Sequence, residues 1–204
     1  MPRERCENCD RPKAVCLCAH LVDVQAPCQV VILQHPSEQK QALATVPILQ
    51  LCLNPLDVYV GEDFSNTQLA NACLQNPERV RVVFPGPQSE QWRSDGLVEG
   101  SQNINVLIVI DGTWRKAKRI WHMNTWLHDL PCVSLSGATS EYRIRSSSVD
   151  DSLSTLEAVA YACQCIDPKG DFNRLRKPFK AMIDMQIERM GESVFLSHYA
   201  KDDY

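Results

Sequence analysis

The sequence lacks the features of exported, membrane-spanning or strongly basic proteins. Its apolar runs are far shorter than the ~18 residues of a membrane helix. The charged N-terminus contains no apolar segment typical of a secretory signal. The formal net charge of −4 provides no global basic field, so a nucleic-acid partner would need local basic patches. We therefore expect a cytoplasmic protein with no membrane partner, and no obligatory protein partner is evident.

Several short motifs of known chemistry are also missing. The chain has no P-loop and no G-x-G-x-x-G, which argues against nucleotide-phosphate binding of those kinds. It has no G-x-S-x-G turn of the type that presents a nucleophilic serine. No histidine pair has metal-ligand spacing on an expected helix. These absences leave the local grouping of other polar residues as the guide to function.

Length and periodicity predict one main α/β domain. The 204 residues, 44% hydrophobic and 23% charged, suit an ordinary soluble protein. Five short apolar segments alternate with helical patterns, which predicts a mostly parallel sheet with helices on both faces. The expected strands are residues 28–33, 56–60, 80–84, 105–110 and 132–135, and the expected helices are residues 39–52, 67–74, a segment after 113, a segment from 154, and 174–190. Residues 89–102 are expected to form a loop with one helical turn, and residues 138–151 a functional loop.

The strand at residues 105–110 ends at the most informative corner of the chain. Its apolar run stops at Asp111-Gly112-Thr113, and a helical pattern begins at once. Open α/β sheets bind ligands at the carboxyl ends of such strands. From the residues alone, Asp111 is equally well interpreted as a helix cap, and Trp114 as a core residue that anchors the helix.

Basic residues cluster in three places despite the negative net charge. One group lies on the helix expected after Asp111, a second in the loop after residue 137, and a third where the last helix opens. From spacing alone, the first group is more often a solvated face than a binding patch. If the groups converge, they form one basic surface suited to phosphates. The candidate RNA-binding residues are Arg115, Lys118, Arg119, Arg145, Arg174 and Lys177.

Four of the ten cysteines are clustered near the N-terminus. In a reducing compartment such a cluster indicates metal ligands rather than disulfides, and four thiolates favour a structural, tetrahedral Zn²⁺ site. Arg5, Arg11 and Lys13 are expected to help keep the thiolates ionised. An iron–sulfur cluster and four unrelated thiols are the alternatives. The cluster defines a zinc-binding segment, residues 1–27, ahead of the main α/β domain, residues 28–204. The expected ligands are Cys6, Cys9, Cys16 and Cys18.

Five ordered blocks of the sequence resemble the DTW-domain family, the tRNA-uridine aminocarboxypropyltransferases. Asp111 to Trp114 matches the D-x-T-W motif, and the resemblance covers nearly the whole chain. The other blocks are the cysteine cluster with Arg11-Pro12, Phe84-Pro85, Tyr142-Arg143-Ile144-Arg145 and Ser154-Thr155-Leu156-Glu157-Ala158. The last block also contains a capping box, which predicts the start of a helix. One departure is Ala44-Thr45, where family members often have Asn-Thr; it bears on one cofactor or substrate contact.

The resemblance implies a fold similar to the SPOUT methyltransferases, with a C-terminal knot, and S-adenosylmethionine as co-substrate. The implied reaction transfers the 3-amino-3-carboxypropyl group to N3 of a uridine in tRNA and releases methylthioadenosine. Because N3 lies on the Watson–Crick edge, the target uridine in the partner tRNA must be unpaired. The cofactor-binding residues implied by the resemblance are Phe84, Pro85, Thr113, Trp114, Leu135, Tyr142, Arg143 and Thr155.

Asp111 is the catalytic residue that the resemblance implies. Uridine N3 is weakly acidic and must lose its proton to attack, which makes Asp111 a candidate base. Holding the ammonium of the transferred group is the competing role, and we favour the base. Two other functions fit the sequence: an RNA methyltransferase on a related knotted fold, and a non-catalytic zinc-containing module that binds RNA.

Overall fold

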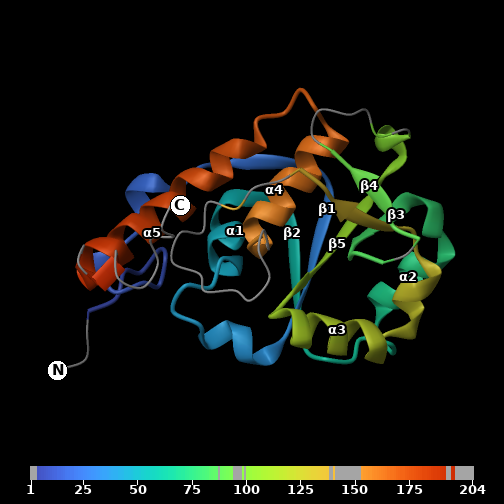
Figure 1. Ribbon diagram of the computed structural model, residues 1–204, viewed down its shortest axis with the longest axis horizontal. Helices are drawn as coiled ribbons and strands as arrows, with labels where there is room; N and C mark the ends of the chain where they lie inside the picture. Colours follow the sequence, from blue (N-terminus) through green and yellow to red (C-terminus); the bar gives the residue numbers. More distant parts are fainter. Residues whose placement is uncertain are drawn as a thin grey trace, which may run out of the picture.

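The centre of the molecule is a six-stranded parallel sheet (Figure 1). The computed structural model describes residues 4–86, 88–93, 98, 100–137, 140, 153–191 and 194–195. Within them the strand order is β2-β1-β5-β3-β6-β4, and every pair of neighbours is parallel. The strands are β1 (Val24–Gln34), β2 (Leu53–Val60), β3 (Val80–Val83), β4 (Glu90–Trp92), β5 (Val106–Asp111) and β6 (Cys132–Leu135). The α/β class and the parallel sheet predicted from the sequence are confirmed.

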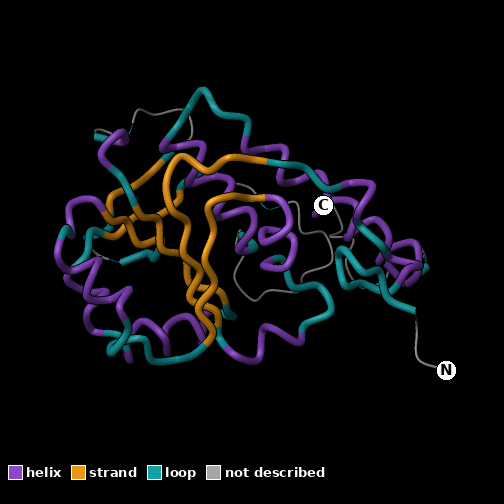
Figure 2. The backbone as a smooth tube through the Cα atoms, turned by 180° about the vertical axis from the view of Figure 1, so that it is seen from behind, coloured by secondary structure: helices purple, strands orange, loops and turns teal. Residues whose placement is uncertain are grey.

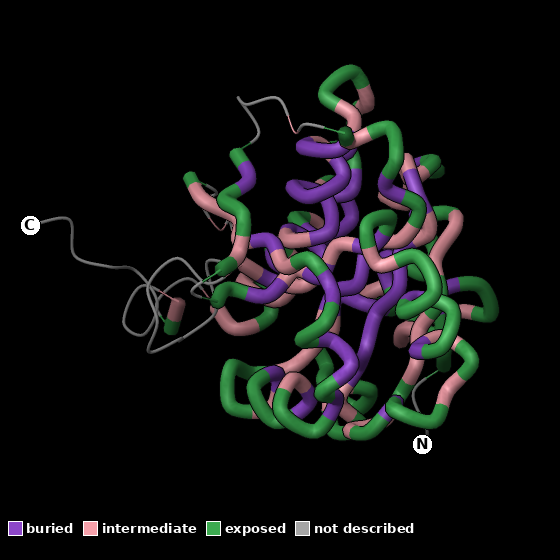
Figure 3. Tube along the Cα trace, turned by 90° about the vertical axis from the view of Figure 1, so that its right-hand side faces the viewer, coloured by how far each residue is buried: buried purple, intermediate pink, exposed green. Residues whose placement is uncertain are grey.

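Helices cover both faces of the sheet (Figure 2). Alternate residues of a strand point to opposite faces: Leu107 and Val109 of β5 pack in one core cluster and Ile108 in the other. The first cluster is covered by α1 (Val46–Cys52), α4 (Thr155–Ile166) and α5 (Arg176–Met190), and the second by α2 (Gln68–Gln75) and α3 (Trp114–Met123). Figure 3 shows the buried residues gathered inside these layers. No described helix combines the length and apolar character needed to cross a membrane.

Short 3-10 helices join these elements. They are η1 (Lys13–Val15), η2 (Cys18–His20), η3 (Pro36–Lys40), η4 (Pro77–Arg79), η5 (Ser101–Asn103), η6 (Thr125–Asp129) and η7 (Phe172–Leu175). The helix expected over residues 39–52 is in fact η3, an irregular stretch and then α1. Proline fits only the first turn of a helix, because its ring nitrogen has no hydrogen to donate. Pro47 therefore marks where α1 begins.

The prediction that residues 89–102 form a loop is partly wrong. The expected helical turn is present as η5, but Glu90–Trp92 forms β4, which pairs with β6 at the edge of the sheet. The strand has three residues, and only Trp92 among them is buried. Two exposed polar residues beside one aromatic residue form no apolar run, so periodicity does not indicate a strand here.

The capping box predicted at the start of α4 is confirmed. The Glu157 backbone N–H donates to Ser154 Oγ (3.3 Å), and the Ser154 N–H donates to a Glu157 carboxylate oxygen (2.8 Å). Glu157 is fully buried, so these bonds and those from Ser140 Oγ (3.0 and 3.2 Å) offset the cost of removing its charge from water. The cap holds the first turn of α4 at the carboxyl edge of the sheet.

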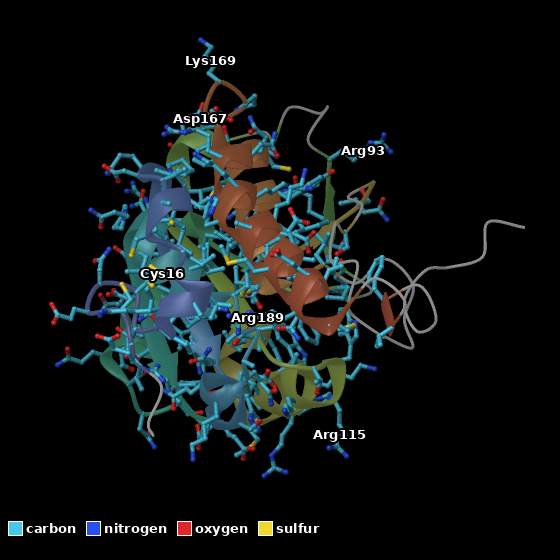
Figure 4. The ribbon with its side chains drawn as sticks, turned by 90° about the vertical axis from the view of Figure 1, so that its left-hand side faces the viewer. Cys16, Arg93, Arg115, Asp167, Lys169 and Arg189 are labelled. Carbon is cyan, nitrogen blue, oxygen red and sulfur yellow. The ribbon has the colours of Figure 1, made fainter. Side chains whose placement is uncertain are left out.

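The N-terminal cysteine segment packs against α5. Leu17 is 1% exposed and belongs to the same core cluster as Met182 of α5. Arg11 Nη1 contacts Met182 Sδ at 3.4 Å, and Arg189 Nη2 donates to the Ala14 carbonyl oxygen at 3.0 Å. Figure 4 shows Cys16 and Arg189 on the same side of the molecule.

Two expectations fall largely outside the described residues. Only Ser140 of the predicted functional loop, residues 138–151, is described. The C-terminal knot implied by the family resemblance stays a prediction, since residues 141–152 and 196–204 also lie outside the described part of the chain.

Asn124 joins the loop after β2 to the end of α3 and to η6. Its side-chain oxygen accepts from the Phe64 N–H (2.6 Å) and from Trp126 Nε1 (3.2 Å). Its side-chain nitrogen donates to the carbonyl oxygens of Glu62 and Ile120, both at 2.7 Å. The residue is fully buried, and all four hydrogen-bonding positions of its amide are filled.

We expect Asn124→Ala to lower the free energy of unfolding by about 3 kcal/mol, because it leaves buried donors and acceptors unpaired. Urea unfolding measures the loss. The matched control is Asn71→Ala on the exposed side of α2, which should change stability by less than about 0.5 kcal/mol. Equal losses in the two variants would contradict the role given to Asn124.

Candidate functional site

A cavity of about 720 Å³ lies at the carboxyl ends of β3, β5 and β6. The first turns of α3 and α4 and the stretch before α1 complete its wall. This is the edge where open parallel sheets bind ligands, and the volume is typical of a small-molecule site. Seven residues predicted from the sequence as site residues line it: Phe84, Pro85, Asp111, Thr113, Trp114, Leu135 and Thr155. The structure therefore brings together residues that are far apart in the chain.

The Asp111 carboxylate ties three elements together at this cavity. One oxygen accepts a hydrogen bond from Gln34 Nε2 at the end of β1 (2.9 Å), and the other accepts from Thr155 Oγ1 at the start of α4. Hydrogen bonds to both oxygens hold the carboxylate in a fixed orientation at the cavity wall. The alternative that Asp111 caps the next helix is wrong, because Thr113 occupies the N-cap position of α3.

Gly112 and Trp114 shape the corner after β5. A Cβ atom added at Gly112 would lie 3.0 Å from Lys116 Cβ, so the glycine leaves room for the first turn of α3. Trp114 is 37% exposed and lines the cavity. The interpretation of Trp114 as a buried core anchor is therefore wrong, and its indole is accessible to a ligand.

Phe84 forms part of the apolar wall and is held by α3. Its ring stacks on Trp121 with centroids 4.4 Å apart and planes 6° apart. Trp121 in turn packs on the His128 ring, with centroids 4.6 Å apart. Offset aromatic pairs of this kind fix ring positions, so the wall at Phe84 is preformed.

Two charged residues of the cavity wall were not predicted from the sequence. Glu38 of η3 and Lys116 of α3 both line it, and Lys116 Nζ lies 2.6 Å from Glu38 Oε1. Ala44 and Thr45, the position that departs from the family pattern, also line the cavity. No signal within the sequence links residue 38 to residue 116, because the contact depends on the folded sheet.

His35 directly follows β1 but is not among the described residues that line the cavity. Its Nδ1 accepts from the Ser37 N–H (3.2 Å), which places the ring proton on Nε2, 2.8 Å from a Glu62 oxygen. Arg119 Nε lies 2.9 Å from the other Glu62 oxygen. The hydrogen bond from Arg119 is the main cause that lowers the pKa of Glu62, and the one from His35 adds to it against the opposing effect of burial.

Of the three basic groups predicted for RNA, the two that the structure describes lie in different layers. Arg115, Lys118 and Arg119 are exposed on α3, where Arg119 also pairs with a carboxylate. Arg174 and Lys177 are exposed near the start of α5, which belongs to the opposite layer (Figure 1). Tyr142, Arg143 and Arg145 lie outside the described residues.

The four N-terminal cysteines form a compact cluster that could bind a metal ion. Their Sγ atoms all lie within 4.8 Å of one another, with 3.5 Å between Cys6 and Cys18 and 3.7 Å between Cys9 and Cys16. Sulfurs bound to one tetrahedral zinc at about 2.3 Å would be about 3.8 Å apart. The spacing in the fold therefore fits such an ion, and no other group of this kind occurs among the described residues.

Backbone N–H groups favour the thiolate form of one of the four cysteines. Hydrogen bonds from the N–H groups of Cys9 and Asn8 lower the pKa of Cys6 to about 6. The pKa of Cys16 is raised to about 12, because its hydrogen bonds with the neighbouring thiols outweigh the one from the Cys18 N–H. The expectation that Arg5 and Lys13 keep the thiolates ionised is wrong. Arg5 Nε pairs with Asp10 (2.7 Å) and Lys13 Nζ with Glu4 (2.6 Å), so both charges are directed to carboxylates.

A parallel α/β sheet with a preformed, partly charged cavity at its carboxyl edge defines a ligand-binding α/β domain. The family model described as the DTW domain matches residues 3–187. The chain therefore belongs to the DTW-domain family. No solved structure matches it.

Named relatives cover most of the chain. It is 31% identical over 204 residues to tRNA-uridine aminocarboxypropyltransferase 2 of Mus musculus, covering 96% of this chain and 67% of that protein. It is 33% identical over 195 residues to tRNA-uridine aminocarboxypropyltransferase 2 of Drosophila melanogaster (91% and 76% covered). It is 28% identical over 199 residues to tRNA-uridine aminocarboxypropyltransferase A of Arabidopsis thaliana (83% and 75% covered).

Proposed function

We propose that the chain is a tRNA-modifying transferase that moves the 3-amino-3-carboxypropyl group of S-adenosylmethionine to N3 of a uridine, releasing methylthioadenosine. The relatives' names and the D-x-T-W motif support this proposal. The observation that carries it is the cavity itself, which combines an apolar wall with the Asp111 carboxylate beside an accessible indole.

The cavity wall suits the substrate in size and chemistry. Phe84, Pro85 and Leu135 offer apolar surface for the adenosine part, and Thr113 and Trp114 lie beside Asp111 for the methionine part. The sulfonium activates the methyl group as well as the methionine Cγ. The protein must therefore present Cγ, not the methyl group, in line with the attacking nitrogen.

Asp111 is the proposed base. It takes the N3 proton of the uridine, N3 then forms the bond to Cγ, and the Cγ–S electron pair stays on the sulfur of methylthioadenosine. A base must be able to reach the N3 proton, and the Asp111 carboxylate lines the cavity beside the accessible Trp114 indole. Trp114 is accessible at the same place and suits a splayed base.

Incubating the protein with unmodified tRNA and carboxyl-labelled S-adenosylmethionine tests this function. We expect label in the tRNA and release of methylthioadenosine. Label retained in S-adenosylhomocysteine would instead indicate an RNA methyltransferase. Binding of tRNA without turnover of either kind would indicate a non-catalytic RNA-binding module.

We expect Asp111→Asn to reduce transfer by roughly 10²–10⁴-fold, the usual contribution of a general base, while S-adenosylmethionine binding changes little. Steady-state kinetics and calorimetric titration separate the two effects. The matched control is Asp129→Asn in η6, an exposed carboxylate, which should leave both unchanged. Normal turnover in Asp111→Asn would contradict the assignment of Asp111 as the base.

We also propose that Cys6, Cys9, Cys16 and Cys18 hold one structural Zn²⁺, since four protein ligands leave no open position for catalysis. Elemental analysis should give about one zinc per chain for the unaltered protein. Cys9→Ser should lose the metal and lower the melting temperature, because the cluster supports the packing of α5. The control Cys132→Ser lies outside the cluster and should keep the metal. Zinc-free protein purified without chelators would contradict the assignment.

A further inference from the structure

The ion pair between Lys116 and Glu38 is largely shielded from water. Lys116 Nζ lies 2.6 Å from Glu38 Oε1, and the two side chains are only 21% and 17% exposed. Shielded ion pairs gain little net stability, because both charges must be taken out of water. Both residues line the cavity, so their charged groups lie where a bound ligand can reach them.

Few of the described residues that line the cavity are acidic or basic. They are Glu38, Asp111 and Lys116, and Lys116 is the basic residue of that set. The remaining described lining residues are apolar or uncharged. A ligand carboxylate in this part of the cavity therefore meets its complementary charge at Lys116.

The fold keeps Lys116 beside the Asp-Gly-Thr corner. The residue lies in the first turn of α3, and a Cβ atom at Gly112 would approach its Cβ to 3.0 Å. Glu38 is brought to it by η3, which follows directly on β1. Both side chains thus reach the cavity from elements that start at neighbouring strand ends.

We propose that Lys116 binds the carboxylate of the aminocarboxypropyl group and that Glu38 binds its ammonium. Such a group has both charges on one carbon, so it can lie antiparallel to a lysine–glutamate pair, each charge facing its opposite. This assignment rests on the proposed function and sharpens it. Lys116 and Glu38 then hold the amino and carboxylate groups of the aminocarboxypropyl group, and Asp111 acts as the base.

Binding to three ligands tests the assignment without any turnover. The ligands are S-adenosylmethionine, its decarboxylated analogue and methylthioadenosine, titrated by calorimetry into the full chain. Lys116→Met should lower the affinity for S-adenosylmethionine by about 10- to 100-fold, the loss expected for one charge-assisted hydrogen bond. The same variant should bind the decarboxylated analogue and methylthioadenosine within about threefold of the unaltered protein, a change of less than 1 kcal/mol.

Glu38→Gln provides the complementary pattern. It should lower the affinity for S-adenosylmethionine and for the decarboxylated analogue, which both contain the ammonium, and leave the affinity for methylthioadenosine unchanged. The matched control is Lys169→Met, an exposed lysine at the opposite end of the molecule from Arg115 of α3 (Figure 4). It should bind all three ligands normally.

Three results would overturn the assignment. If Lys116→Met lowered the affinity for all three ligands equally, Lys116 would have a purely structural role. Normal S-adenosylmethionine binding in Lys116→Met would remove the carboxylate contact. If Arg143→Gln, and not Lys116→Met, weakened the binding of S-adenosylmethionine without weakening that of the decarboxylated analogue, the carboxylate contact would belong to Arg143. The variants could show the expected binding affinities for the three ligands while the protein transfers nothing to tRNA. That result would contradict the proposed reaction but not this assignment.

Discussion

The site depends on one carboxylate that is shared by three elements. Asp111 ends the central strand β5 and accepts hydrogen bonds from the end of β1 and the start of α4. A partly buried carboxylate is stable only when its oxygens are satisfied, so the strand ends and the helix must meet in this arrangement. The cavity wall follows from it. Gly112 then lets α3 begin close to the sheet, and α3 brings Lys116 and Trp114 to the same edge.

Two features far from this carboxylate hold the surrounding layers. The cysteine cluster packs on α5 through Leu17 and Arg11, in the layer that also contains α4. In the other layer, Asn124 ties the end of α3 to the loop after β2. Asn124 therefore supports α3, which contributes Lys116 and Trp114 to the cavity, and the cluster supports the layer of α4, which contributes Thr155. That support is what a preorganised site requires.

Local pattern was enough to predict the parallel sheet, the Asp111 corner, the α4 capping box and the four-cysteine cluster. Each depends on residues close together in the sequence, such as Ser154 and Glu157. The strand β4 was missed because Trp92 is its only buried residue. The Lys116–Glu38 pair and the placement of α3 and α5 in opposite layers were also missed. Both depend on the order in which strands assemble, which local periodicity does not contain.

The central claim is that this cavity directs the methionine Cγ of S-adenosylmethionine, rather than its methyl group, towards an acceptor base. A crystal structure of the protein with S-adenosylmethionine tests it most directly. We expect the aminocarboxypropyl end to lie between Lys116 and Glu38, with Cγ facing the accessible side beside Asp111 and Trp114. A complex in which the methyl group faces that side, with the amino-acid end turned away from Lys116, would contradict it.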